Sequence, residues 1–188
     1  RGEVTQKDTK LLTAAFCAGL LERALHEDVN IVNAEVLLRE RGIKLTEESR
    51  AEMGAFSSAI VAEVSGDNRS CVAGGTLFGN NMPRLFRLQD YRLEAYLDGI
   101  LLVFTHEDVP GVIGSVGTIF GKHNINIAQM AVGRSLDEPG GGAIGVLNLD
   151  GLPSQEALDE MLQHEGIHSA RVIQMPPAGQ LPVWLQTR

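Results

Sequence analysis

Hydrophobic positions near the start of the chain recur at the spacing of α-helices. In residues 8–25 they return at every fourth position on one face, and residues 30–42 form a second predicted helix. Both segments carry residues that commonly cap helices. Asp8 and Asn33 stand near the two starts, and Gly42 follows the second end. The chain is therefore predicted to begin with two helices.

The next segment changes to alternating, β-branched runs that are typical of strands. Such runs are predicted at residues 42–45, 55–64, 68–79, 84–88 and 92–97. A Gly-Asp pair separates the second run from the third, and Gln89 and Asp90 separate the last two, so both points are predicted turns. Two helices followed by several antiparallel strands predict a small mixed α+β domain.

From Gly99 onwards strands and helices alternate. The predicted strands cover residues 100–106, 125–134, 141–150 and 168–175, and the predicted helices cover residues 109–124 and 154–164. Their order is βαββαβ, which is the ferredoxin-like plan. A domain boundary is therefore predicted near Asp98–Gly99. The tail 176–188 is proline-rich and not periodic, and its Trp184 is expected either to dock on a neighbouring element or to fray.

Four glycines follow the strand at residues 100–106, and such a pattern can begin a nucleotide-binding unit. The dinucleotide fingerprint G-x-G-x-x-G places its glycines in the turn between strand and helix. Gly111, Gly114, Gly117 and Gly121 are instead three, three and four positions apart, which places them on one face of a helix. Glycine inside a helix costs about 1 kcal/mol relative to alanine. We therefore exclude a Rossmann fold and expect another backbone to approach this face closely.

The start of the same helix offers a site for a free amino acid. The N–H groups of a first helical turn are unpaired and the macrodipole adds positive character, so a small carboxylate is stabilised there. Asp108, just before Pro110 in the predicted first turn, can bind an ammonium group. Asn126 can bind through its amide, because the strand that it begins is expected beside the first strand or close to its end. The alternative is that Asp108 only caps the helix and Asn126 only makes a turn.

Composition and charge narrow the classes of partner. The chain has 188 residues, 44% of them hydrophobic, and a formal net charge of −8, which is typical of a soluble globular protein without affinity for nucleic acid or an anionic membrane. No apolar run approaches the roughly 20 residues of a membrane span. The five histidines show no metal-binding spacing. Cys17 and Cys71 are interpreted as buried thiols of a reducing compartment, so we expect a cytoplasmic protein without a bound metal.

Two groups of motifs resemble a known family. The segment "GILLVFTHEDVPGVIGSVGTIFGKHNINIAQMAVGR" and the later "AIGVLNLD" closely resemble the ACT domain at the C-terminus of D-3-phosphoglycerate dehydrogenase, a small-molecule sensor. Upstream, "AGLLE", "VNIVNAEVLLRERGIKL" and "VAGGTLFGNNMPRLFRL" resemble the allosteric substrate-binding domain that intervenes in the long form of that enzyme. The resemblance covers residues 1–175. It implies a substrate-binding-type domain at residues 1–98 and an ACT domain at residues 99–175.

The resemblance also implies roles within the ACT domain. In this family the ACT domains pair, and L-serine binds at their interface as an allosteric effector. The side chains that match this site belong to His106, Asp108 and Asn126. The backbone segment that matches the serine carboxylate comprises Val109, Pro110, Gly111, Val112 and Ile113. The family varies at the position of His106, which at an exposed strand end is otherwise an ordinary solvated residue.

The resemblance further implies a site in the first domain. In the family this domain can bind an anion such as the phosphorylated substrate, and Arg84 is the best candidate, with backbone donors from Gly75 and Thr76. Glycines in a strand equally indicate a bulge. Arg87 and Arg92 are interpreted as solvated charges at a strand edge.

The catalytic parts of that enzyme are not recognisable in the sequence. A nucleotide-binding domain and a histidine–carboxylate pair are missing, and "RGEV" resembles the tail of an earlier strand. We therefore expect a regulatory fragment with neither catalytic residues nor a cofactor, from a longer NAD-dependent dehydrogenase. Two alternatives stay open. One is the regulatory half of an iron–sulfur L-serine dehydratase, whose cluster needs several cysteine thiolates. The other is an ACT dimerisation module that no longer binds a ligand.

Overall fold

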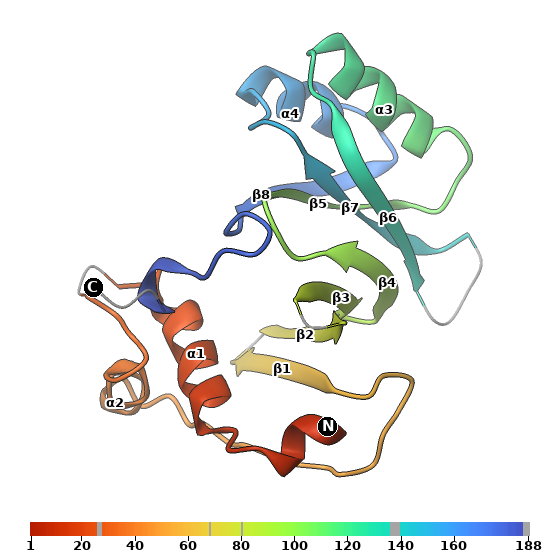
Figure 1. Ribbon diagram of the computed structural model, residues 1–188. Coiled ribbons are helices and arrows are strands. Elements are labelled where there is room, and N and C mark those ends of the chain that lie inside the picture. The colour runs from red at the N-terminus through yellow and green to blue at the C-terminus, as the bar shows by residue number, and fades with distance from the viewer. Residues whose placement is uncertain (26–27, 68, 80, 136–139, 186–188) are drawn as a thin grey trace. The chain divides into compact units, whose positions relative to one another are not determined.

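The computed structural model describes residues 1–25, 28–67, 69–79, 81–135 and 140–185. The chain forms two compact units, of which the first comprises Arg1–Ala59 with Gln180–Arg188 and the second comprises Ile60–Gly179. Figure 1 labels their helices and strands. The described residues contain four α-helices and an eight-stranded sheet, so the predicted α+β class is confirmed.

The first unit is built from helices. Its elements are the 3-10 helix η1 (Glu3–Gln6), α1 (Lys10–Leu21), α2 (Ala34–Glu40) and the 3-10 helix η2 (Val183–Leu185). α1, α2 and the segment between them share one apolar cluster. The cluster comprises Cys17, Ala18, Leu21, Val29, Ala34, Leu37 and Leu38. Trp184 packs against this cluster. The two predicted helices are confirmed, and Trp184 docks on their shared core.

Local backbone chemistry sets the ends of these helices. The Asp8 carboxylate accepts a hydrogen bond from the backbone N–H of Lys10 at 3.0 Å. Gly42 has φ of +71° beyond the end of α2, as expected for the residue after a helix. The strand predicted for residues 42–45 is wrong, because this short run pairs with none of the strands of the described sheet.

The second unit contains the sheet. Its strands are β1 (Ala59–Gly66), β2 (Arg69–Phe78), β3 (Met82–Leu88), β4 (Tyr91–Tyr96), β5 (Ile100–Glu107), β6 (Ile127–Ser135), β7 (Gly142–Leu149) and β8 (Ile167–Gln174). Within the described residues the strands lie in the order β1-β2-β3-β4-β6-β7-β5-β8. The predicted strands from residue 55 onwards are thereby confirmed, and they join into one continuous layer.

β1–β4 follow one another as neighbours, and their pairing contains two irregularities. Gln89 has φ of +53° at the predicted turn between β3 and β4. The register shifts between Gly74 and Gly75, and again between Leu85 and Arg87. A register shift changes which side chains share a face. Arg87 consequently lies directly opposite Arg92 on the neighbouring strand.

The last six elements of the second unit confirm the ferredoxin-like plan. β5, α3 (Val112–Lys122), β6, β7, α4 (Gln155–Leu162) and β8 follow in βαββαβ order, and their strands lie in the order β6-β7-β5-β8. α3 and α4 lie together on one face of these strands (Figure 1). The core between helices and strands comprises Leu102, Phe104, Val112, Val116, Ile119, Phe120, Leu147, Leu149, Met161 and Ile167.

A second apolar cluster joins the upstream strands to the ferredoxin-like strands. It comprises Leu85, Ala95, Leu101, Ala131 and Val146, which come from β3, β4, β5, β6 and β7. β4 also pairs with β6, through Tyr91 with Ser135 and Arg92 with Arg134. The predicted boundary near Asp98–Gly99 therefore lies inside the second compact unit.

Two further features bear on the sequence-based expectations. Among the described residues, no helix is long and apolar enough to cross a membrane. Both cysteines are free, and Cys17 is buried as predicted, whereas Cys71 is exposed. The prediction of a buried thiol at Cys71 is wrong because this residue stands near the start of β2, outside the apolar cluster.

Candidate functional site

The start of α3 presents backbone donors, as the sequence predicts. Gly111 is the N-cap with φ of +100°, and no side-chain hydrogen bond from the described residues caps this end. The N–H groups of the first turn are thus available to a carboxylate. Pro110 precedes the N-cap rather than standing in the first turn, because the positive φ of Gly111 delays the helix until Val112. Val109 is exposed, while Val112 is buried and Ile113 packs against the core.

His106 lies at the end of β5 on the face that α3 and α4 cover. Its side chain is buried, with 2% of the residue exposed, and its ring stacks on Phe104 at a centroid distance of 5.2 Å. The interpretation of His106 as a solvated residue is therefore wrong, since alternation along β5 places it on the same face as Phe104 and Leu102.

The hydrogen bonds of His106 define what it can offer a ligand. Nδ1 lies 2.7 Å from the backbone carbonyl oxygen of Glu107, which can only accept, so Nδ1 carries the proton. In the neutral imidazole Nε2 is then an acceptor. Nε2 is buried and has no hydrogen-bond partner among the described residues. A buried acceptor without a partner is costly, and a ligand hydroxyl or ammonium group would satisfy it.

Asp108 lies between β5 and α3 and is already engaged within the chain. Its side chain is 14% exposed; its Oδ2 forms an ion pair with Arg134 Nε at 2.8 Å and accepts a hydrogen bond from the Gly140 N–H at 3.4 Å. The backbone N–H of Asp108 donates to the carbonyl oxygen of Gly141 at 2.9 Å. Asp108 therefore has a fixed position next to the start of α3. Arg134 was not predicted as a site residue, although "VGR" at the end of the strand was part of the recognised motif.

Asn126 lies far from Asp108 within one chain. Its amide donates to Asp150 at 2.6 Å, and the following residue Ile127 pairs with Leu149, which pairs with the first residue of β5. Asp108 follows the last residue of β5, so the length of this strand separates the two side chains by roughly 25 Å. The expectation that they lie together in one chain is wrong, because α3 runs back along the sheet and β6 begins at the end where β5 began.

The glycine face of α3 is open within the chain. A Cβ added at Gly114, Gly117 or Gly121 would meet no atom within 4 Å in the described structure. No described backbone of the same chain therefore explains why glycine occupies these positions. Close approach of a second molecule to this face stays a prediction.

Arg84 is held in a cluster of aromatic side chains. Only 8% of the residue is exposed, and its guanidinium lies 3.8 Å from the ring centroid of Tyr96 and 5.6 Å from that of Phe78. Nη1 donates to the carbonyl oxygen of Pro83, whereas Nε has no hydrogen-bond partner among the described residues. Thr76 is buried and stands directly opposite Arg84. At an anion site, the neighbouring Gly75 would contribute only its backbone N–H group.

Three other arginines form a row across the middle of the sheet. Arg87, Arg92 and Arg134 are paired in register across β3, β4 and β6. Directly paired residues share a face of a sheet. The interpretation of Arg87 and Arg92 as strand-edge charges is wrong, because β3 and β4 are interior strands of the described sheet.

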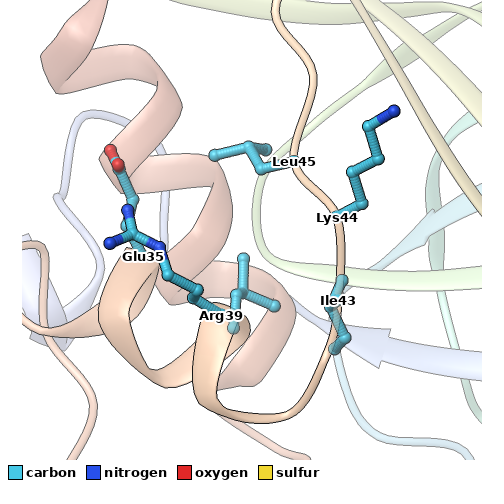
Figure 2. A pocket seen from close by; sticks show the side chains of 6 residues that line it. Glu35, Arg39, Ile43, Lys44 and Leu45 are labelled. Carbon is cyan, nitrogen blue, oxygen red and sulfur yellow. The ribbon is translucent and has the colours of Figure 1, made fainter.

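The described residues show a pocket in another part of the chain and no cluster of metal ligands. No group of three or more histidine, cysteine, aspartate or glutamate residues that could hold a metal ion occurs in the described part of the chain. Figure 2 shows a pocket in the first unit, formed by α2 and the segment after it. It is lined by Glu35, Leu38, Arg39, Ile43, Lys44 and Leu45, none of which is a predicted site residue.

Comparison with known proteins identifies two domains in the chain. A family model described as the D-3-phosphoglycerate dehydrogenase intervening domain matches residues 1–89, and an ACT domain model matches residues 100–166. The two matches lie on either side of the predicted boundary near Asp98–Gly99. All the residues predicted to hold serine fall within the ACT match.

Relatives that match most of this chain occur in bacteria and archaea. The D-3-phosphoglycerate dehydrogenase of Archaeoglobus fulgidus is 37% identical over 93% of this chain, and that of Methanocaldococcus jannaschii is 33% identical over 93%. The enzyme of Bacillus subtilis is 31% identical, also over 93% of this chain. The chain spans only about a third of the length of these relatives, with shares of 33%, 32% and 33%.

Proposed function

Since the chain joins an intervening domain to an ACT domain, and so belongs with the C-terminal regulatory region of D-3-phosphoglycerate dehydrogenases, we propose that it binds L-serine as an allosteric effector. Serine is the amino acid that the family resemblance implies. The observation that carries the proposal is the convergence of three groups at the end of β5. These are the acceptor Nε2 of His106, the carboxylate of Asp108 and the free N–H groups of α3.

These groups match the three polar parts of an amino acid. The serine carboxylate binds the N–H groups at the start of α3, where the macrodipole favours negative charge. The ammonium group binds Asp108 through a charge-assisted hydrogen bond. The serine hydroxyl donates to Nε2 of His106 and so satisfies a buried acceptor.

Asn126 takes part in this site only if two copies of the chain form it. Within one chain, Asn126 and Asp108 lie apart by the length of β5. We infer that a second copy supplies Asn126, in a symmetric pair in which each molecule contributes one half to each of two sites. The open glycine face of α3 provides room for close packing of such a copy.

Serine bound between two copies would favour one arrangement of the subunits. We propose that this preference is passed to NAD-dependent catalytic domains elsewhere in a longer protein, and that the present chain contributes neither catalytic residues nor the cofactor site. A ligand shifts such an equilibrium only by its differential affinity, which is typically about 1–3 kcal/mol of coupling. The intervening-domain match favours this function over the dehydratase alternative.

Titration calorimetry with the 188-residue chain tests the proposal. We expect heat of binding with L-serine and at least tenfold weaker binding in Asp108→Asn, which keeps the shape of the side chain but loses its charge. Asp159→Asn on α4 is the matched control, since it removes the same charge from an exposed position. Absence of binding in the parent chain, or equal affinity in the parent and Asp108→Asn, contradicts the proposal.

We further propose that the intervening domain, matched at residues 1–89, binds an anion such as a phosphate monoester at Arg84. Thr76 and the backbone of Gly75 lie nearby. The buried Nε of Arg84, without a hydrogen-bond partner in the described residues, supports this second site. Inorganic phosphate should then raise the melting temperature of the parent chain but not that of Arg84→Lys, which keeps the charge and loses the planar fork. An equal rise in both proteins contradicts the assignment to Arg84.

A further inference from the structure

The ion pair between Asp108 and Arg134 joins two side chains of very different exposure. Arg134 Nε lies 2.8 Å from Asp108 Oδ2, and the Arg134 side chain is 67% exposed while that of Asp108 is 14% exposed. The carboxylate is therefore largely covered, whereas the guanidinium can return to water at small cost. The partner that gives way to an incoming cation is Arg134.

A bound amino acid needs the same carboxylate. An ammonium group on Asp108 would stand within a few ångströms of the Arg134 guanidinium, and two like charges at that distance repel each other. Arg134 also lies directly opposite a second cation, Arg92, across the β4–β6 pair. The two cations therefore compete for one carboxylate.

We propose that Arg134 is an internal counter-ion that the ammonium group of the effector displaces from Asp108. Without ligand, Arg134 occupies the ammonium subsite. With ligand, the arginine returns to solvent and the ammonium takes its place. Arg134 thereby sets the affinity of the site and its preference for ligands that carry an ammonium group. This inference rests on the proposed function, because it assumes that an amino acid binds at Asp108.

Calorimetry on Arg134→Gln measures the competition. Removing the competitor should tighten L-serine binding by about two- to fivefold, which is the affinity equivalent of a half-exposed ion pair. L-glycerate has a hydroxyl in place of the ammonium group, so its affinity should not rise in the same variant. Arg171→Gln on β8 removes the same charge from an exposed residue without an ion pair to Asp108, and serine affinity should be unchanged in it.

A second measurement uses the unmodified chain. The Nε–H proton of Arg134 gives an NMR signal that is sensitive to its ion pair with Asp108. Saturating L-serine should move this signal to the position of a solvated arginine, while the Arg171 signal stays where it was. This readout remains valid even if Arg134→Gln unfolds.

The possible outcomes separate the inference from the function on which it rests. If the parent binds serine, any one of three results overturns the inference alone. These are equal or weaker serine binding in Arg134→Gln, equal tightening in Arg171→Gln, and an Arg134 signal that serine does not move. Weaker binding would identify Arg134 as a residue that positions Asp108. If neither the parent nor Arg134→Gln binds serine, the proposed function and the inference are overturned together.

Discussion

At the residue scale, strand alternation explains both what could and what could not be predicted for His106. The family motif predicted that this residue is part of the site, and the residues alone could not show whether it was buried. Burial depends on which face of β5 the helices cover, and that is a tertiary property. Arg134 was missed for a related reason. It stands 26 positions after Asp108, and only the β6–β7 register brings it next to the end of β5.

Replacing His106 should weaken serine binding with little effect on the stability of the fold. His106→Phe keeps a ring on Phe104 and removes a buried acceptor that has no partner in the described residues, so the free energy of unfolding should change by less than about 1 kcal/mol. Serine affinity should fall by about three- to tenfold, because one hydrogen bond is lost. Chemical denaturation and calorimetry measure the two effects. His168→Phe, at an exposed position of β8, is the control and should retain serine affinity.

At the element scale, the glycine spacing predicted the helix α3 but not what lies against its glycine face. The i, i+3 and i, i+4 spacing correctly placed three of the four glycines inside a helix, and the structure shows that their face is open. The fourth, Gly111, is the N-cap, where its positive φ is required. Whether a partner covers the open face could not be predicted from one sequence, since a partner surface leaves no periodic signal in the chain that receives it.

Alanine substitutions in α3 test this interpretation. Gly117→Ala should stabilise the isolated chain by up to about 1 kcal/mol, because alanine favours the helix and meets no neighbour in the described structure. It should also weaken self-association, since the added methyl group separates two closely packed backbones. Gly145→Ala is the opposite case. Its Cβ would overlap the ring of Phe104, so we expect a loss of about 1–3 kcal/mol. Unchanged self-association in Gly117→Ala, measured by sedimentation, contradicts packing on this face.

Glu160 joins α4 to the end of α3 and gives this contact a pH dependence. Its carboxylate accepts from Lys122 at 2.8 Å and from His123 at 2.9 Å, and these hydrogen bonds lower the pKa of Glu160. A carboxyl group with a lowered pKa in the folded state contributes stability above its unfolded pKa and loses it as the pH falls through the folded pKa.

The Glu160→Gln variant should therefore melt below the parent at pH 7, and the difference should disappear as the pH falls below the ordinary range of glutamate. Melting curves of both proteins between pH 7 and pH 3 measure this effect. Glu165→Gln in the same region has no such contact in the described structure and serves as the control. A difference in melting temperature that is independent of pH would show that shape, not charge, matters at this position.

At the scale of the whole molecule, the sequence predicted the order of elements but not how β1–β4 join the ferredoxin-like strands. Local patterns identify strands, whereas the pairing of β4 with β6 is a long-range choice. The same limit applies to the predicted effector site. The motif assigned His106, Asp108 and Asn126 to one ligand, and the structure separates Asn126 from the other two within a chain. A site formed by two copies reconciles these facts.

Mixing two defective variants shows whether two copies of the chain share each serine site. Asp108→Asn and Asn126→Ala should each lose serine binding when measured alone. In a mixed pair, one site combines both substitutions and the other is intact, so free exchange of subunits should restore about a quarter of the sites with parental affinity. Calorimetric titration of the mixture after exchange gives the number of restored sites. Recovery of these sites is the result that we predict. A mixture that stays inactive although the pairs have exchanged would contradict a serine site shared between two copies of the chain.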